Sequence, residues 1–326
     1  METLEGDELC FPQLLNSSCR KPRRPHTGVT LFYFLSLISV FTTALNLLVI
    51  ISISHFRQLH TTTNLLLLSL AVSDFLVGLI VMPAEIILAE TCWFLGDLIC
   101  AVYYLLPFII VSASVESMVL ISVDRYVAIC YPLHYPNKVT FKRVRLAISL
   151  CWICSLLVSI VILYDHLKKP GTYNSCYGEC VVDIAGDVDL VLNFIIPISI
   201  IIILYMRVFV VAVSQARALR SHITAVTLQR SRTVTDKRSE LKAARTLGIV
   251  VAVFLMCYCP YYCLALTGGT IMIGSSAEAF MSFLMYFNSC LNPVIYAFFY
   301  PWFRKAVRLI VTLQVMQPGS CEANIL

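Results

Sequence analysis

Residues 276–300, SAEAFMSFLMYFNSCLNPVIYAFFY, form an apolar run as long as a membrane crossing requires. The hydrocarbon layer of a bilayer is about 30 Å thick, and a helix needs about 20 mostly apolar residues to span it. Pro293 lies inside the run. A proline there would break a soluble helix, but a membrane bundle tolerates it because neighbouring helices satisfy the freed backbone groups. The run therefore predicts a membrane helix with a kink.

Six similar runs precede this one, so the whole chain reads as a membrane protein. Of its 326 residues, 59% are hydrophobic and 13% charged, and the mean hydropathy is +0.83, far above that of a soluble domain. We predict an all-α integral membrane protein, a seven-transmembrane helix bundle over 28–300 with an extracellular tail at 1–27 and an amphipathic eighth helix with a cytoplasmic tail at 301–326. The six earlier spans are expected at 28–54, 63–88, 97–131, 146–164, 187–213 and 242–268, with further proline kinks at Pro83, Pro107, Pro197 and Pro260.

Basic residues predict the orientation of the bundle. With the N-terminus outside, most of the 24 Lys and Arg residues fall inside, at Arg57, 138–145, 207–245 and 304–308. The positive-inside rule favours this topology, and the net charge of +5 then reflects sidedness, not nucleic-acid binding. The first 27 residues lack a signal-peptide pattern, so the first helix is expected to direct insertion. Asn16 begins an Asn-Ser-Ser acceptor pattern, which predicts a glycan on the outer tail.

The 14 cysteines divide by position. Most lie in or beside apolar spans, where cysteine acts as a small hydrophobe. Those on the oxidising side predict disulfides. We expect Cys100 to pair with Cys180, and Cys176 to pair with either Cys10 or Cys19, fastening the tail and a loop over the mouth of the bundle. Cys92 also lies outside.

Polar side chains inside the spans are candidates for function, because lipid disfavours them. Five of them lie deep in four different helices and predict a network that holds a hydrated sodium ion, that joins the helices by hydrogen bonds, or that does both. They are Asn46, Asp74, Ser114, Asn288 and Asn292. At the inner ends of the third and sixth spans, Arg125 of Asp124-Arg125-Tyr126 and Glu240 predict an ion pair that latches the two helices together.

These features resemble the rhodopsin-like G-protein-coupled receptors over almost the whole chain. The resemblance implies that Arg125 and Tyr296 rearrange as the sixth helix swings outward and opens a pocket for a G-protein α subunit. Tyr258 stands where that family usually has Trp. The motifs that carry the resemblance are Asn46, Asp74, Asp124-Arg125-Tyr126, Trp152, Pro197, Cys257-Tyr258-Cys259-Pro260 and Asn292-Pro293-Val294-Ile295-Tyr296.

A narrower resemblance lies in residues 288–303, NSCLNPVIYAFFYPWF. They meet every fixed position of the fingerprint of the trace amine-associated receptors, N-S-x-x-N-P-x-x-Y-x-x-x-Y-x-W-F. This resemblance implies an olfactory-type receptor for small mono-, di- or polyamines. It also implies a stimulatory or olfactory G protein with rising cyclic AMP, regulation by arrestin and a receptor kinase, and a place in the plasma membrane of olfactory sensory neuron cilia.

The amine anchor departs from the family pattern. A buried alkylammonium needs a carboxylate partner, yet the usual aspartate, eighteen residues before the arginine of the third helix, is Pro107 here. In this respect the chain resembles fish-type members of the trace amine-associated receptors, some of which carry the acid at another position. Asp189 and Asn193 precede Pro197 at four-residue steps, so all three share one helix face, with Asp189 about 12 Å further out. Asp189 is the expected anchor; otherwise it is a solvated acid at the mouth. Asp187 is expected to be solvated.

Other side chains are expected near the amine. Glu85 in the outer second helix is a possible second acid that would let a diamine or polyamine bridge the cavity, or else a rim acid that pairs with a loop base. Aromatic rings could hold the ammonium through cation-π contacts or simply fill the core. The candidate rings are Tyr103, Tyr104, Tyr261, Tyr262 and Tyr286.

Other classes of protein fit the sequence less well. There is no zinc-spaced histidine cluster and no phosphate-binding glycine loop, so we expect no enzyme. The seventh span has no lysine for a retinal Schiff base, and the sequence shows no repeated half typical of a transporter. A receptor for a non-amine or peptide ligand and a membrane transporter stay as alternatives. No cofactor is expected apart from the sodium ion.

Overall fold

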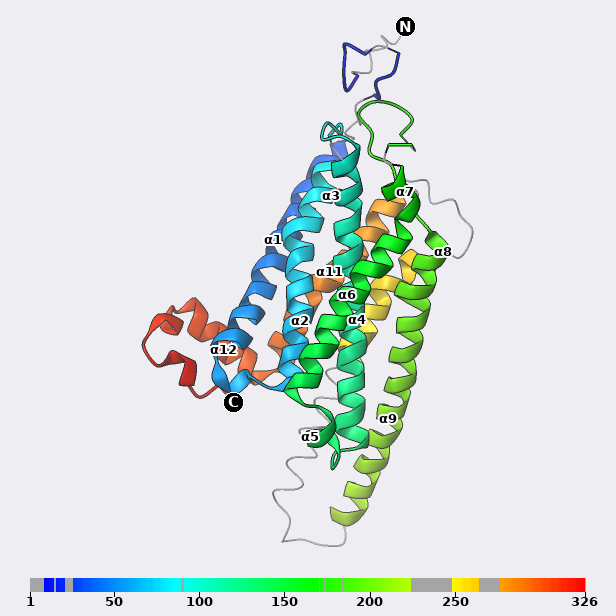
Figure 1. Cartoon of the computed structure of the whole chain (residues 1–326). Helices are drawn as coiled ribbons and strands as arrows, with labels where there is room; N and C mark the ends of the chain where they lie inside the picture. The colour runs from blue at the N-terminus through cyan, green and yellow to red at the C-terminus, as the bar shows by residue number, and fades with distance from the viewer. Residues whose placement is uncertain are drawn as a thin grey trace.

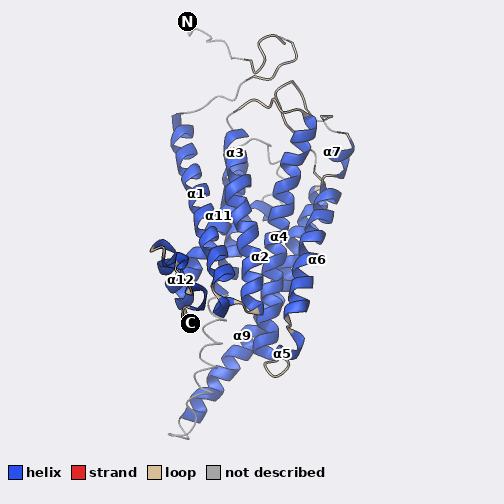
Figure 2. Ribbon diagram, turned by 60° about the vertical axis from the view of Figure 1, so that its left-hand side comes forward, coloured by secondary structure: helices blue, strands red, loops and turns tan. Residues whose placement is uncertain are grey.

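We describe the protein from a computed structural model. The structure describes residues 9–14, 16–20, 26–88, 91–169, 171–172, 174–182, 184–223, 248–263 and 276–325. Glu240, the predicted partner of Arg125, lies outside these residues. Long helices occupy the core of each of the seven predicted spans and run side by side as one bundle (Figure 1). Figure 2 shows helices and loops, with no strand in the described part of the chain.

The bounds of the helices follow the predicted spans closely. The first, third, fourth and seventh spans are α1 (His26–His55), α4 (Asp97–Cys130), α6 (Phe141–Ile162) and α11 (Ser276–Phe299). The second comprises α2 (Thr62–Leu76), η2 (Val77–Val81) and α3 (Met82–Leu88), and the fifth comprises α8 (Gly186–Asp189), η3 (Leu190–Ile195) and α9 (Ile196–Ile223). The sixth is described over Gly248–Cys263. Shorter helices are η1 (Arg57–Leu59), α5 (Tyr135–Lys138), α7 (Tyr164–Lys168), α12 (Pro301–Val311), η4 (Gln314–Met316) and η5 (Ser320–Glu322).

The outer surface of the bundle is apolar, as expected of helices that face lipid. Large apolar side chains such as Val40, Ile203 and Phe209 are more than half exposed on the outside of the helices. A soluble protein would bury such a surface, whereas hydrocarbon solvates it. Five described segments are long and apolar enough to cross a membrane by themselves. The predicted fold class, an all-α membrane bundle, is confirmed.

Two helices continue beyond the predicted limits. The helix of the fifth span runs to Ile223 instead of ending at residue 213, and α6 begins at Phe141 instead of residue 146. The extension of the fifth-span helix contains Arg, Ala, Leu and Gln, and that of α6 contains Lys and Arg, residues that favour helix even in water. Hydropathy marks where a helix leaves lipid, not where its backbone hydrogen bonds end.

Each of the two π-helical segments ends two residues before a proline. η2 precedes Pro83, and η3 precedes Pro197. A proline has no N–H to bond the carbonyl four residues earlier, and its ring crowds that carbonyl, which is Leu79 for Pro83 and Asn193 for Pro197. A wider turn relieves this crowding. Because a π turn changes the rotation of everything beyond it, both segments affect which side chains face the bundle interior.

The predicted amphipathic eighth helix is α12, which turns away from the bundle after Tyr300 (Figure 1). Trp302, Phe303 and Ala306 pack inward, while Arg304 and Lys305 are exposed. Beyond α12 the chain folds back against the inner end of α1. There the His55 ring lies 3.0 Å from the Ser320 hydroxyl, and Arg57 pairs with Glu322 at 3.0 Å.

Candidate functional site

A cavity of about 780 Å³ lies between the outer halves of the helices, beneath the tail and the loop before the fifth span. Nine residues were expected at the amine site, namely Asp189, Glu85, the five tyrosines, and Asn193 and Pro107 beside them. Eight of these nine line the cavity, whereas Tyr262 stacks on Phe194, with ring centroids 4.3 Å apart. The eight are Glu85, Tyr103, Tyr104, Pro107, Asp189, Asn193, Tyr261 and Tyr286.

Asp189 lies buried in the cavity wall, where neighbouring side chains hold its carboxylate by hydrogen bonds. The residue is 6% exposed, and its carboxylate accepts a 2.8 Å hydrogen bond from the Asn193 amide one turn further along the helix. The Asn193 carbonyl in turn accepts a 2.9 Å bond from the hydroxyl of Ser112 on α4, and Tyr262 of the sixth helix also bonds Asp189. A carboxylate has about four lone-pair sites, so acceptor capacity is left for a ligand.

The neighbouring Asp187 differs from Asp189 in its exposure and in its position relative to the cavity. Its side chain is exposed, and it does not line the cavity. Both acids lie in the first turn of the fifth helix, where the helix dipole favours negative charge. Only Asp189, however, is positioned to meet a buried ligand.

The third helix offers no acid to the described cavity wall. At the position of the usual aspartate, Pro107 faces the cavity between Tyr104 and Phe108. The acids in the wall are Glu85, Asp189 and Glu179, and the last was not predicted from sequence because it lies in a loop without periodicity.

Glu85 lies in a second group of polar and aromatic side chains. Its side chain is hydrogen-bonded to Tyr103 of α4, and Tyr286 of α11 lies close enough to interact electrostatically with it. The Tyr103 ring contacts Trp93 at 5.8 Å, and the Tyr286 ring contacts Phe283 at 6.2 Å between centroids. Glu85 therefore belongs to the cavity and not only to its rim.

Three disulfides fasten a cover over the cavity. Cys100 is joined to Cys180, as expected, and Cys176 is joined to Cys19, one of its two expected partners. Cys10 does not pair with Cys176 but with Cys92 in the loop before α4. Several tail and loop cysteines are interchangeable in sequence, so only their placement in space selects the pairs.

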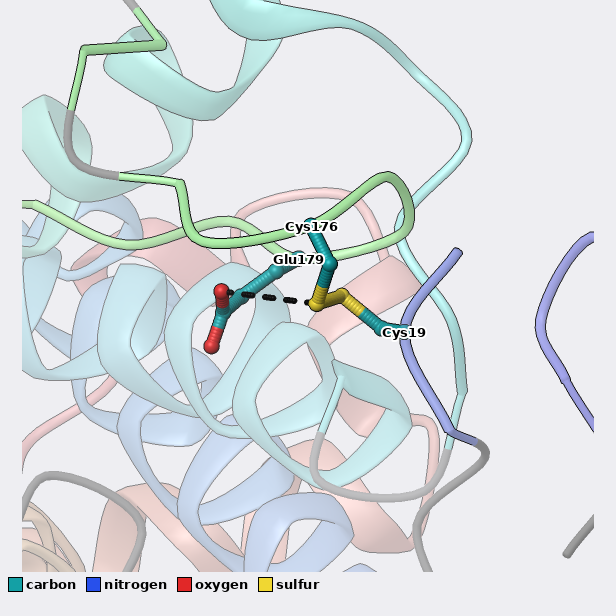
Figure 3. Close-up of side chains that lie close together, drawn as sticks. All are labelled: Cys19, Cys176 and Glu179. Carbon is teal, nitrogen blue, oxygen red and sulfur yellow. Dashed lines mark hydrogen bonds between the residues drawn. A yellow bond between two sulfur atoms is a disulfide. The ribbon is translucent and has the colours of Figure 1, made fainter. Parts of the chain in front are cut away.

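Backbone pairing aligns the tail with the loop. The Cys19 N–H donates to the Tyr177 carbonyl, and the Tyr177 N–H donates to the Ser17 carbonyl, both at 2.8 Å. Glu179 lies beside the Cys19–Cys176 disulfide (Figure 3). This group is no metal site, because the disulfide uses both thiols. Asn16 is exposed in this cover, and its glycan stays a prediction.

Deeper in the bundle, Asp74 is completely buried and accepts hydrogen bonds from three side chains of two other helices, α4 and α11. Ser114 donates at 3.1 Å, Ser289 at 2.8 Å and the Asn292 amide at 2.8 Å. Ser289 thus takes the place expected for Asn288, whose side chain instead bonds Cys257. The sequence places both residues on the seventh helix, and only helix rotation decides which faces Asp74.

The Asp74 group has the oxygens that a sodium ion prefers. In the described part of the chain, the side-chain oxygens of Asn46 and Asn292 are buried without hydrogen-bond partners, near a carboxylate and two hydroxyls. Hard cations bind such oxygens, so Asp74, Ser114, Ser289 and Asn292 would hold the ion. Sodium binding stays a prediction.

Tyr258 connects the sixth helix to this group. Its hydroxyl bonds Ser114, and its ring stacks on Phe254 with centroids 4.3 Å apart. A tryptophan, which the family usually has here, could not reproduce that phenolic bond. Pro260 lies two residues further out on the same helix.

At the inner end of α4, Arg125 is held by its own neighbour. It bonds the Asp124 carboxylate from Nε at 3.0 Å and also contacts Thr63. Asp124 further accepts 2.8 Å and 3.0 Å bonds from Tyr135 and Thr63, partners that the sequence did not suggest.

The other predicted activation residues lie nearby. The Tyr126 ring packs on Tyr131, with centroids 5.8 Å apart. Tyr296 is buried one turn beyond Pro293, and its ring centroid lies 5.9 Å from that of Tyr300. Its hydroxyl has no hydrogen-bond partner among the described residues. A buried hydroxyl without a hydrogen bond costs free energy, so a rearrangement that supplies a partner for Tyr296 would be favoured.

Comparison with known proteins agrees with this architecture. The model of the 7 transmembrane receptor (rhodopsin family) matches residues 45–296. Trace amine-associated receptor 13c of Danio rerio is 35% identical over 98% of this chain and 97% of its own length. Trace amine-associated receptor 4 of Mus musculus is 34% identical over 98% and 95%, and trace amine-associated receptor 8b of Rattus norvegicus is 36% identical over 98% and 96%. This is a family of receptors and not of enzymes. The chain therefore belongs to the trace amine-associated receptors, within the rhodopsin family of seven-transmembrane receptors.

Proposed function

We propose that this receptor detects small amines through an ion pair between the ligand ammonium and Asp189. The observation that carries the proposal is the place of Asp189, a buried carboxylate in the wall of a cavity whose usual acid position is Pro107. A buried carboxylate and a buried ammonium each cost several kcal/mol when unpaired, so each recruits the other. The names of the related receptors also point to amines.

The surroundings of Asp189 suit an alkylammonium. The Asn193 bond orients the carboxylate, and Tyr261 lines the same wall with its ring 5.1 Å from that of Tyr262. A phenol ring within about 6 Å of a cation adds a cation-π attraction. Apolar side chains of Pro107, Phe108 and Val111 also line the cavity and favour the alkyl portion of the ligand.

Binding is transmitted to a stimulatory or olfactory G protein and raises cyclic AMP. In this arrangement Arg125 is tied to Asp124, which keeps the inner end of α4 in a resting state. A ligand that draws the fifth and sixth helices together through Asp189 and Tyr262 favours a different packing, since a ligand shifts an equilibrium by its differential affinity for the two states. Arrestin and a receptor kinase then act on the active state, in the plasma membrane of olfactory sensory neuron cilia.

The test is a cyclic AMP dose–response to a panel of amines in cells that express the receptor with a stimulatory or olfactory α subunit. Asp189→Asn should raise the half-maximal amine concentration at least about 30-fold, since removing one partner of a buried charge pair costs about 2–5 kcal/mol. Asp187→Asn is the matched control and should behave as wild type. Surface antibody staining verifies equal expression. Equal dose–response curves for wild type and Asp189→Asn would refute the assignment of Asp189 as the amine anchor.

Coupling and location have their own tests. In cells that lack both stimulatory and olfactory α subunits the amine response should vanish, and restoring either subunit should return it. A response that persists without them would refute this coupling. Antibody labelling of olfactory epithelium should show the receptor in cilia, and labelling confined to other tissues would contradict that location.

A further inference from the structure

We propose that residues 320–325 act as an intramolecular clip, which holds the junction of α11 and α12 against α1 and so favours the resting state of the receptor. The clip consists of η5 and the residues that follow it. Figure 1 shows this segment in red beside α12 and the inner end of α1. The inference concerns the inner side of the bundle and goes beyond the recognition of amines.

The clip is anchored by one apolar side chain. Ile325 is fully buried and belongs to the same core cluster as Phe56, Leu59 and Phe303. Its N–H donates a 3.0 Å hydrogen bond to the side chain of Gln58 in η1. Burial of a large aliphatic side chain stabilises a contact far more than an exposed ion pair does. The clip is therefore docked through Ile325.

The turn that leads into the clip is also fastened to α1. Gly319 has a φ of 81°, in the left-handed region that glycine adopts without strain. The hydroxyl of Ser320, the next residue, donates a 2.6 Å hydrogen bond to the Val315 carbonyl and lies 3.0 Å from the His55 ring nitrogen. The turn and its side-chain bonds thus direct the clip toward the inner end of α1.

The contacts of the clip close a ring around α12. Along the chain, α12 contacts η4, η4 contacts η5, and η5 contacts η1, which directly follows α1. α12 also packs against α1 itself, and its Phe303 and Ala306 are buried. With Ile325 in place, α12 cannot move away from α1 unless these contacts break or η1 moves with it.

α12 is joined as firmly to α11. The guanidinium of Arg304 in α12 donates hydrogen bonds to the carbonyls of Ala297 and Phe298, both at 3.0 Å. These carbonyls belong to the last turn of α11, which a helix leaves without partners of its own. The ring of Tyr300, at the junction, lies 5.9 Å from that of Tyr296. A displacement of the inner end of α11 therefore displaces α12.

This coupling connects the clip to activation. The resemblance to rhodopsin-like receptors implies that Tyr296 rearranges on activation, and its hydroxyl has no partner among the described residues in the present arrangement. Movement of Tyr296 carries the end of α11 and hence α12, which disturbs the ring that Ile325 closes. A docked segment shifts an equilibrium toward the state in which it binds better. The clip accordingly favours the resting state, and activation must in turn loosen the clip.

The first experiment measures guanine-nucleotide exchange without any amine, in membranes that hold the full-length receptor and each class of G-protein α subunit in turn. At matched surface expression, Ile325→Ser should raise this basal exchange at least about fivefold, the low end of the usual coupling between two sites. Asn324→Ser changes the exposed neighbour of Ile325 and is the matched control. It should behave as wild type.

A second variant weakens the clip without removing a side-chain contact. The space around Gly319 is open, but an alanine there is strained at the left-handed φ. Gly319→Ala should therefore raise basal exchange in the same direction as Ile325→Ser, and by less. It also keeps the proposal testable if Ile325→Ser fails to fold.

Hydrogen–deuterium exchange over residues 314–325 reports the docking itself. The amides of this segment should exchange slowly in wild type and faster in both variants, and faster in wild type when a nucleotide-free G protein is bound. Fast exchange in resting wild type, or slow exchange in Ile325→Ser, would show that Ile325 does not anchor a clip. Faster exchange in the variants with unchanged basal activity would show a clip without influence on signalling. Because no amine is present, none of these results bears on Asp189.

Discussion

The side-chain amide of Asn193 donates a 2.8 Å hydrogen bond to the Asp189 carboxylate one helical turn away. Its own carbonyl is fixed by the hydroxyl of Ser112 on the neighbouring α4, so the amide has one orientation. An acid that is buried beside a ligand cavity is thereby held in place by the third helix, although that helix carries no acid of its own at the usual position.

Asn193→Ala should weaken amine responses without abolishing them. The variant removes a hydrogen bond to a charged group, worth about 1.5–3 kcal/mol, so the half-maximal amine concentration should rise at least about tenfold at unchanged maximal cyclic AMP. Ser112→Ala should have a smaller effect in the same direction, since it frees the amide to rotate but keeps it. If Asn193→Ala matched wild type, the bond would have no role in binding.

Asp74 should make the receptor sensitive to sodium. We predict that the buried carboxylate and the oxygens around it bind a sodium ion in the resting state, so that NaCl should lower amine potency relative to an equal concentration of KCl. Coupling of this kind is typically 5- to 150-fold. Amine-stimulated GTP exchange on membranes would measure it, with Asp74→Asn expected to show no difference between the salts. Equal potency of wild type in both salts would exclude an ion that opposes activation.

Tyr258→Phe should raise the basal activity of the receptor. The variant keeps the ring that stacks on Phe254 but loses the hydroxyl that bonds Ser114, one of the ties between the sixth helix and α4. A bond of about 0.5–1.5 kcal/mol corresponds to a two- to tenfold shift in the resting equilibrium. Basal cyclic AMP at matched surface expression measures the change. Tyr164→Phe, at an exposed ring, is the control, and lower basal activity in Tyr258→Phe would contradict the role of this bond.

The two disulfides of the tail should be separable by mapping and mutation. Mass analysis without reduction should recover Cys10 joined to Cys92 and Cys19 joined to Cys176. Cys10→Ser, Cys92→Ser and the double variant should reduce surface expression and potency equally, because each removes the same bond. Additive losses in the double variant, or a Cys10–Cys176 peptide, would show a different pairing.

The contact between the C-terminal segment and the inner end of α1 should depend on burial, not charge. Ile325 is fully buried, and its N–H bonds Gln58 at 3.0 Å. Ile325→Ala should cost about 2 kcal/mol and lower the thermal midpoint of the purified receptor. Glu322→Ala should change it little, since Glu322 and Arg57 are about 70% exposed and such pairs contribute at most about 1 kcal/mol. A larger loss of thermal stability in Glu322→Ala than in Ile325→Ala would contradict this prediction.

Much of the molecule could be predicted because its signals are local. Membrane spans follow from runs of apolar residues, and orientation follows from where Lys and Arg fall. The shared face of Asp189 and Asn193 follows from helix periodicity alone, and the structure buries both. The loss of the third-helix acid was equally visible, because a single residue, Pro107, occupies that position.

Contacts between helices could not be predicted in the same way. Ser112 was not expected to meet Asn193, nor Ser289 rather than Asn288 to meet Asp74, and Cys10 was not expected to meet Cys92. These contacts depend on the rotation of each helix about its axis. The π-helical turns before Pro83 and Pro197 alter that rotation, and the fold of the tail alters the cysteine pairs.

The sequence by itself predicted the seven spans, their sidedness and the family, and it named the candidate acids, since each depends on residue type and spacing along one helix. Only the tertiary structure decided which side chains hold Asp189, which tyrosines surround Glu85 and that both acids line one cavity. The physical reason is that a hydrogen bond needs two groups within about 3 Å. Helices far apart in the sequence reach that distance only through their packing.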